Sequence, residues 1–84
     1  MREMNNMANV EMPRMSDNMT EGYIEQWLVE DNSYVTVGQE ILQIETEKAL
    51  MTYEAENEGD LKIIVLAGES VQIGVLIATI TERS

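Results

Sequence analysis

The chain has 84 residues and a mass of 9.5 kDa, which is the size of one small domain. It carries 16 acidic and 5 basic residues, and a net charge of −11 disfavours nucleic acid as a partner. Cysteine and histidine are absent, which excludes disulfides, thiol nucleophiles, imidazole catalysis and zinc sites built on those ligands. No apolar run is long enough for a membrane span and no secretory leader is visible, so we expect a soluble cytoplasmic domain without catalytic side chains.

The hydrophobic pattern predicts short strands joined by tight turns. Residues 1–9 are rich in Asn and Met and are predicted to form a flexible N-terminal tail. The folded domain is expected at residues 10–81, where apolar runs alternate with Gly, Asn, Asp and Glu clusters, and residues 82–84 form the C-terminal end. No window keeps a helical apolar period for three turns. Strands are predicted at residues 9–12, 22–29, 34–37, 40–46, 49–55, 60–66, 71–73 and 75–81.

The two halves of the chain resemble each other, first at an offset of 37 residues and then at 36. Apolar residues recur together with two glycine pairs, and Asn32 stands where the second half has Gly68. Two similar β-halves packed face to face predict an all-β fold, a flattened sandwich with pseudo-twofold symmetry. The matched pairs are Gly22/Gly59, Ile24/Leu61, Trp27/Ile64, Leu28/Val65, Val35/Val71, Val37/Ile73, Gly38/Gly74, Ile41/Ile77 and Ile44/Ile80.

Lys48 lies between the halves, where two predicted strands leave room for a short hairpin. A hairpin tip is exposed, so another protein can reach its side chain. The acidic surroundings favour the charged ammonium, and a lysine that acts as a base or forms a Schiff base needs burial or a cationic neighbour. Lys48 is therefore either a solvated hairpin lysine or an attachment point that a separate enzyme modifies. Lys62, the other lysine, falls inside a predicted strand.

The segment around Lys48 resembles the lipoyl domain of 2-oxo acid dehydrogenase acyltransferases. Such domains carry an E-T-D-K-A motif whose lysine takes lipoic acid in amide linkage, and residues 45–49 read E-T-E-K-A. Residues 12–16 and 19–22 resemble the family's M-P-x-L-S and M-T-E-G, an opening more typical of pyruvate, branched-chain or acetoin systems. Departures occur at 32–34 and at Thr52, where the family often has Gly-Asp and an acidic residue. Ile24, Trp27, Gly59, Gly68, Val71 and Gly74 also recur at the family's intervals.

The resemblance implies a flattened β-barrel or sandwich of two four-stranded antiparallel sheets, with lipoic acid attached covalently to Lys48. Glu45, Thr46, Glu47 and Ala49 would form the recognition surface around it. The sister biotinyl domain has the same fold but an M-K-M motif, and Glu47 and Ala49 flank Lys48 in this chain. A biotinyl carrier of a carboxylase or decarboxylase is therefore the alternative. A third possibility is an interaction module whose Lys48 is never modified.

The function that the resemblance implies is that of a swinging-arm carrier, with the chemistry performed on the cofactor. Lipoyl-Lys48 would accept an acyl group from a thiamine-diphosphate-dependent 2-oxo acid decarboxylase and pass it to coenzyme A at an acyltransferase core. Dihydrolipoamide dehydrogenase would reoxidise it, and a lipoate ligase or lipoyl transferase would load it. The domain would be no enzyme by itself, monomeric in isolation, and located in the cytoplasm or the mitochondrial matrix.

Alternating acidic residues follow the Lys48 region, at Glu54, Glu56, Glu58 and Asp60. They do not match the ligand spacing of an EF-hand calcium loop, and residues 57–59 read as a turn. A solvated face is therefore favoured, and no metal site is predicted. The acidic surface with Glu45, Glu54, Glu56 and Glu58 either steers the domain towards basic patches on partners or serves solubility alone.

Overall fold

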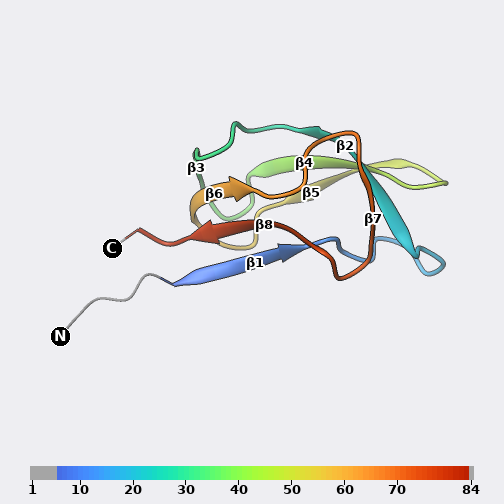
Figure 1. Ribbon diagram of the computed structural model, residues 1–84, viewed down its shortest axis with the longest axis horizontal. Helices are drawn as coiled ribbons and strands as arrows, with labels where there is room; N and C mark the ends of the chain where they lie inside the picture. Colours follow the sequence, from blue (N-terminus) through green and yellow to red (C-terminus); the bar gives the residue numbers. More distant parts are fainter. Residues whose placement is uncertain (1–5, 84) are drawn as a thin grey trace.

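The computed structural model describes residues 6–83, which form eight β-strands and, over that range, no helix (Figure 1). Consequently, these residues contain no helix that could span a membrane. Each strand matches one of the eight predicted segments, with ends that differ by no more than three residues. The strands are β1 (Met7–Glu11), β2 (Glu21–Trp27), β3 (Tyr34–Val35), β4 (Glu40–Glu45), β5 (Leu50–Glu54), β6 (Gly59–Ile63), β7 (Ser70–Gln72) and β8 (Leu76–Thr81).

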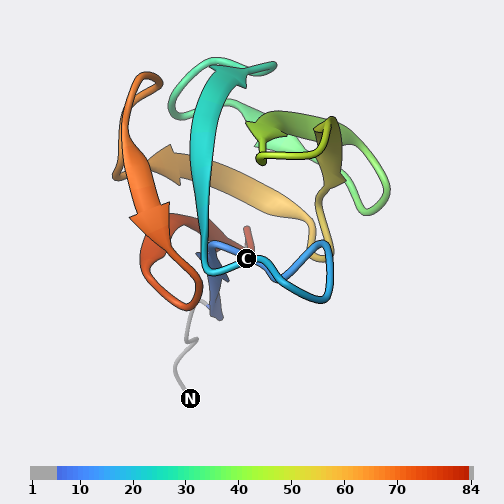
Figure 2. The ribbon, with the colours of Figure 1, turned by 90° about the vertical axis from the view of Figure 1, so that its right-hand side faces the viewer.

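The strands form two four-stranded antiparallel sheets, in the orders β1-β8-β6-β3 and β5-β4-β2-β7. Viewed along the long axis, the strands surround a central core (Figure 2). The second order follows from the first when β1, β8, β6 and β3 are replaced by β5, β4, β2 and β7. This correspondence is the one that the internal repeat predicts, so the all-β sandwich with pseudo-twofold symmetry is confirmed.

Backbone hydrogen bonds repeat between the halves at the predicted offsets. The N–H of Leu28 donates to the carbonyl of Ile41 at 2.9 Å, and its counterpart Val65 donates to Ile77 at 3.1 Å. Gly38 and Gly74 donate to Ala55 and Met12, at 2.8 and 3.0 Å. Both glycines have positive φ, at 89° and 91°, as the turn interpretation requires. Asn32 and Gly68 also share positive φ, at 69° and 99°, so the asparagine replaces glycine without leaving the turn conformation.

The two halves differ at the end of β2 and after β6. Trp27 is half-buried and its indole Nε1–H donates to the carbonyl of Val65 at 2.9 Å, whereas its counterpart Ile64 is 47% exposed. The indole of one half thus reaches across to the backbone of the other. The predicted pairing of Trp27 with Ile64 holds in sequence register, but the two side chains occupy different environments.

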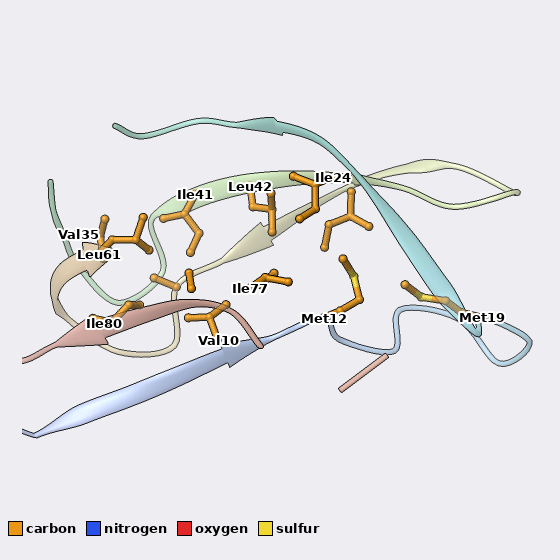
Figure 3. Packing of buried hydrophobic residues seen from close by; sticks show 13 residues of the cluster. Val10, Met12, Met19, Ile24, Val35, Ile41, Leu42, Leu61, Ile77 and Ile80 are labelled. Atoms are coloured by element: carbon orange, nitrogen blue, oxygen red, sulfur yellow. The ribbon is translucent and has the colours of Figure 1, made fainter. Parts of the chain in front are cut away.

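The core lies between the two sheets and takes side chains from both (Figure 3). Three repeat pairs, Ile24/Leu61, Ile41/Ile77 and Ile44/Ile80, are at most 1% exposed. No buried polar or charged side chain is found within residues 6–83, so apolar contact holds the sheets together. The cluster consists of Val10, Met12, Met19, Ile24, Val35, Ile41, Leu42, Ile44, Ala55, Leu61, Ile77, Ala78 and Ile80.

The first strand begins earlier than the sequence pattern predicts. Residues 7 and 8, which we expected only in the flexible tail, belong to β1 and pair with β8. Ala8 is half-buried and lies opposite Ile80, so a weakly apolar segment is held as a strand by its partner. Residues 1–5 of the expected tail, and Ser84, lie outside the described residues.

Candidate functional site

The hairpin between β4 and β5 positions Lys48 at its tip. Glu45 lies opposite Leu50 as the last strand pair, and the N–H of Thr46 donates to the carbonyl of Ala49 at 2.9 Å. The central residues of the turn are Glu47 and Lys48, both exposed. Figure 1 shows this tip at the end of the molecule opposite the start of β1 and the end of β8.

The hydroxyl of Thr46 braces the turn. Its Oγ1 accepts hydrogen bonds from the N–H groups of Lys48 at 3.2 Å and of Ala49 at 3.1 Å, and donates to the carbonyl of Ala49 at 3.1 Å. Short polar side chains commonly satisfy turn backbone groups in this way. Thr46 therefore fixes the backbone from which the side chain of Lys48 departs.

Within residues 6–83, the ammonium group of Lys48 forms neither a hydrogen bond nor an ion pair, so it is free to be approached by another molecule. Lys62 is also exposed, but it lies in β6, where its backbone is paired with Thr79 of β8. Exposure alone does not separate the two lysines. Only Lys48 projects from a two-residue turn, where a modifying enzyme can surround the backbone on both sides.

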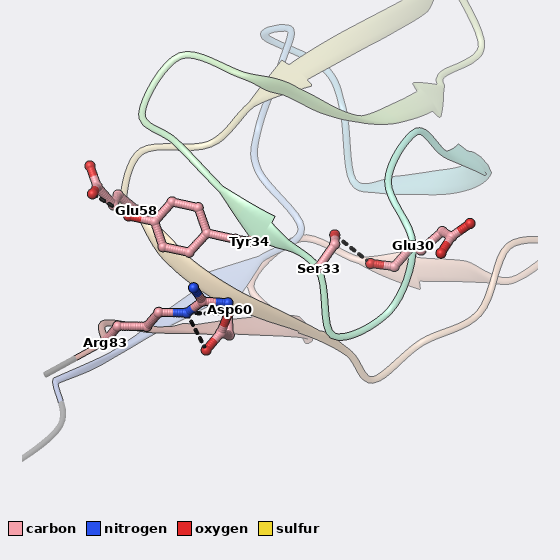
Figure 4. A network of polar contacts seen from close by, with 6 residues as sticks. All are labelled: Glu30, Ser33, Tyr34, Glu58, Asp60 and Arg83. Carbon is pink, nitrogen blue, oxygen red and sulfur yellow. Dashed lines mark hydrogen bonds and ion pairs between the residues drawn. The ribbon is translucent and has the colours of Figure 1, made fainter.

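Fewer acidic residues lie near Lys48 than follow it in the sequence. Glu45 and Glu47 flank it, but Glu54 lies opposite Glu40, at the far end of the β4–β5 hairpin. Glu58 also lies at the far end, beside Met7 and Glu82, and its carboxylate accepts a hydrogen bond from the hydroxyl of Tyr34 (Figure 4). The carboxylates of residues 54, 56 and 58, which follow Lys48 in the sequence, therefore do not surround it, because strand direction carries them to the other end of the molecule.

At that other end, polar contacts connect β3 and β6 to the segment after β8 (Figure 4). Arg83 forms an ion pair with Asp60 at 2.8 Å, and its guanidinium lies 4.6 Å from the centroid of the Tyr34 ring. The hydrogen bond to Glu58 raises the pKa of Tyr34, and the one to Asp60 raises the pKa of Arg83. Residues 6–83 contain no group of three acidic side chains that could hold a metal ion. Asp60 and Glu58 thus have structural partners.

A hollow of about 370 Å³ lies beside the hairpin. One wall is the hairpin tip, and the facing wall is the loop between β1 and β2, which Figure 2 shows below the hairpin at the same end of the molecule. Sequence reasoning missed the loop side, because only the strand pairing of Tyr23 with Glu45 brings the two together. The lining residues are Ser16, Asn18, Met19, Thr20, Glu21, Tyr23, Glu45, Thr46, Glu47, Lys48 and Ser70.

Comparison with known proteins identifies the family. The profile of the biotin/lipoyl family, described as "Biotin-requiring enzyme", matches residues 8–80. The chain belongs to the biotin/lipoyl family. The match runs from β1 into β8 and includes the whole β4–β5 hairpin, so the predicted family and the observed fold agree.

Several relatives of this biotin/lipoyl domain are components of 2-oxo acid dehydrogenase complexes. The succinyltransferase component of the Bacillus subtilis 2-oxoglutarate dehydrogenase complex is 36% identical over 90% of this chain and 18% of its own length. The acetyltransferase component of the Rhizobium meliloti pyruvate dehydrogenase complex is 45% identical over 86% and 17%. The mitochondrial pyruvate dehydrogenase protein X component of Chaetomium thermophilum is 43% identical over 89% and 17%. The chain spans less than a fifth of each of these relatives.

Both transferase relatives are named for a dihydrolipoyllysine residue. They come from a 2-oxoglutarate and a pyruvate complex, so similarity at this level is shared between complexes with different substrates. The names favour the lipoyl branch of the biotin/lipoyl family over the biotinyl branch, in agreement with the residues that flank Lys48 in the sequence.

Proposed function

We propose that this chain is a lipoyl carrier domain and that lipoic acid is attached in amide linkage to Nζ of Lys48. The observation that carries the proposal is the position of Lys48, an exposed and unpaired lysine in the centre of a braced two-residue turn. The relatives named for a dihydrolipoyllysine residue support it. An amide at this tip needs no rearrangement of the core, because both central turn residues are solvent-exposed.

The residues of this chain hold and present the cofactor. Thr46 fixes the turn, while Glu45, Glu47 and Ala49 provide the surface that a lipoate ligase or lipoyl transferase reads beside the target amine. When bound, lipoic acid supplies a cyclic disulfide that takes up an acyl group and two electrons. Within residues 6–83 no histidine, cysteine or buried carboxylate stands near Lys48 to act as an acid or base, which fits a carrier.

In its complex, the domain would visit three sites. These are a thiamine-diphosphate-dependent 2-oxo acid decarboxylase, an acyltransferase core with coenzyme A, and dihydrolipoamide dehydrogenase. We assign the chain to the acyltransferase component, in the cytoplasm or the mitochondrial matrix, with residues 10–81 and the preceding start of β1 as a monomeric carrier. Tethering would raise the effective concentration of the arm at each site, and the charge of −11 would favour basic partner surfaces.

The alternative is a biotinyl carrier of a carboxylase or decarboxylase, which the family description itself includes. Co-expression with a lipoate ligase or with a biotin ligase, followed by intact-mass measurement, separates the two. A lipoyl adduct adds about 188 Da and a biotinyl adduct about 226 Da. We expect the lipoyl adduct alone. Lys48→Arg should remove it, whereas the matched variant Lys62→Arg should retain it. A biotinyl mass, or an adduct lost only in Lys62→Arg, would contradict the proposal.

A further inference from the structure

We propose that the hollow beside the hairpin is a docking site for the uncharged sulfur-containing ring carried by Lys48, so that the arm rests against its own domain between partners. This inference rests on the proposed function. Lys48 is itself part of the lining, so a group attached to its Nζ begins at the edge of the hollow. A tethered group needs little affinity to occupy a neighbouring site, because its effective concentration there is high.

Two side chains of the mostly polar lining, a thioether and an aromatic ring, can contact such a ring. Met19, only 5% exposed, and Tyr23, 37% exposed, both line the hollow. A thioether and an aromatic ring make favourable contacts with the sulfur atoms and methylene groups of a small ring. Its volume of about 370 Å³ is at the lower end of the range for small-molecule pockets.

The loop that forms the far wall is held in place before any group arrives. The Arg14 guanidinium donates to the carbonyls of Asp17 at 3.1 Å and of Met19 at 3.4 Å. The N–H of Met15 donates to the sulfur of Met19 at 3.1 Å. A Cβ on Gly22 would lie 3.1 Å from Cε of Met19, so the side chain packs tightly over this glycine. A preformed wall lowers the ordering cost of binding.

The charges of the lining select an uncharged group. Three carboxylates, those of Glu21, Glu45 and Glu47, line the hollow, and Lys48 is the only cation among the lining residues. Amide formation at Nζ removes that positive charge and leaves the acidic side chains. An anionic group would then be repelled, whereas the cyclic disulfide, the protonated dithiol and an acetyl thioester are all uncharged and are not.

Nuclear magnetic resonance of the loaded domain tests the proposal. Intact mass first establishes the adduct, so a failure of loading counts against the proposed function and not against docking. In the loaded protein we expect cross-peaks between the ring protons of the arm and the methyl group of Met19 and ring of Tyr23. The signals of Met19 and Tyr23 should shift on loading, while the methyl signal of Met7, which pairs with Thr81 at the opposite end, stays unchanged.

A matched pair of tyrosine variants provides the control. Tyr23→Ala should abolish the cross-peaks to Met19 and narrow the lines of the arm to those of a free chain. Tyr34→Ala removes a tyrosine of nearly equal exposure, 38% against 37%, at the end of the molecule opposite the hairpin. This variant should leave the cross-peaks to Met19 and the line widths of the arm unchanged. A loaded wild-type domain whose arm shows free-chain lines and no cross-peaks overturns docking. Equal loss in both tyrosine variants would also overturn it.

Discussion

The hydroxyl of Thr46 shapes the turn that carries Lys48. It takes part in three hydrogen bonds, two of them accepted from backbone N–H groups in a turn that is open to water. Because Glu47 and Lys48 keep negative φ, the turn uses no glycine, and the threonine side chain supplies the closure instead. A residue that we first expected in the recognition surface therefore also determines the geometry of attachment.

Thr46→Ala should loosen the hairpin tip without unfolding the domain. We expect a loss of about 1 kcal/mol in the free energy of unfolding, the usual net value of such hydrogen bonds. Amide hydrogen exchange at Lys48 and Ala49 should become several-fold faster, and lipoate ligase should load the variant more slowly. Thr46→Ser keeps the hydroxyl and should restore exchange and loading. Unchanged exchange in Thr46→Ala would show that the hydroxyl does not hold the turn.

The position of Lys48 could be predicted from the sequence, because two apolar runs separated by five polar or small residues leave room only for a hairpin. The bracing by Thr46 could not, since it depends on the turn geometry. The hollow could not either, because Met19 and Lys48 meet only through the pairing of β2 with β4.

Among the strands, β3 is shorter than predicted because its end enters a turn. The predicted strand 34–37 stops at Val35, and Thr36 begins a turn in which its N–H donates to the side chain of Gln39 at 3.0 Å. Alternation of apolar residues continues through this turn, so the sequence pattern does not show where pairing ends. Strand existence was therefore predictable, whereas strand ends depended on local hydrogen bonds.

The contacts that join β3 and β6 predict alkaline destabilisation. The hydrogen bond to Glu58 raises the pKa of Tyr34 above its usual 10.0, and burial raises that of Tyr53. A raised phenol pKa means that the folded state prefers the neutral form. The stabilising contribution is therefore complete below pH 10.0 and is lost as pH rises through the folded-state pKa.

Urea unfolding from about pH 9 to pH 12 measures this effect. We expect the free energy of unfolding of the wild type to fall steadily above the ordinary tyrosine pKa. Tyr34→Phe should be less stable than the wild type at neutral pH and should lose less on going to alkaline pH. Tyr53→Phe should reduce the alkaline loss in the same way. If Tyr34→Phe and the wild type lost the same free energy of unfolding at alkaline pH, ionisation of Tyr34 would not contribute to the destabilisation.

For the molecule as a whole, pseudo-twofold symmetry makes the halves equal in the core but unequal at their ends. The offset of 36 residues carries Glu45, just before the turn, onto Thr81, at the end of β8. The place equivalent to the Lys48 hairpin is thus where β8 ends and β1 begins, and not a second hairpin. Of the two symmetry-related places within residues 6–83, only the β4–β5 turn is a hairpin that can present a lysine.

The matched variants Ile41→Val and Ile77→Val test whether the two halves contribute equally to the stability of the core. Both isoleucines are fully buried at equivalent positions of β4 and β8. Removing one methylene from either should lower the free energy of unfolding by about 1 kcal/mol in a single cooperative transition. Val37→Ala, at a residue 64% exposed, should change it by less than about 0.5 kcal/mol. A two-step transition in either isoleucine variant would mean that the halves unfold separately.

The proposal that Lys48 carries lipoic acid is tested most directly by the mass of its peptide in protein purified from its own host. Proteolysis between Lys48 and Lys62, followed by fragment sequencing, assigns any adduct to one of the two lysines. We predict an increase of about 188 Da on the peptide that contains Lys48 and none on the peptide that contains Lys62. An unmodified Lys48 in native material, or an adduct with the mass of biotin, would contradict it.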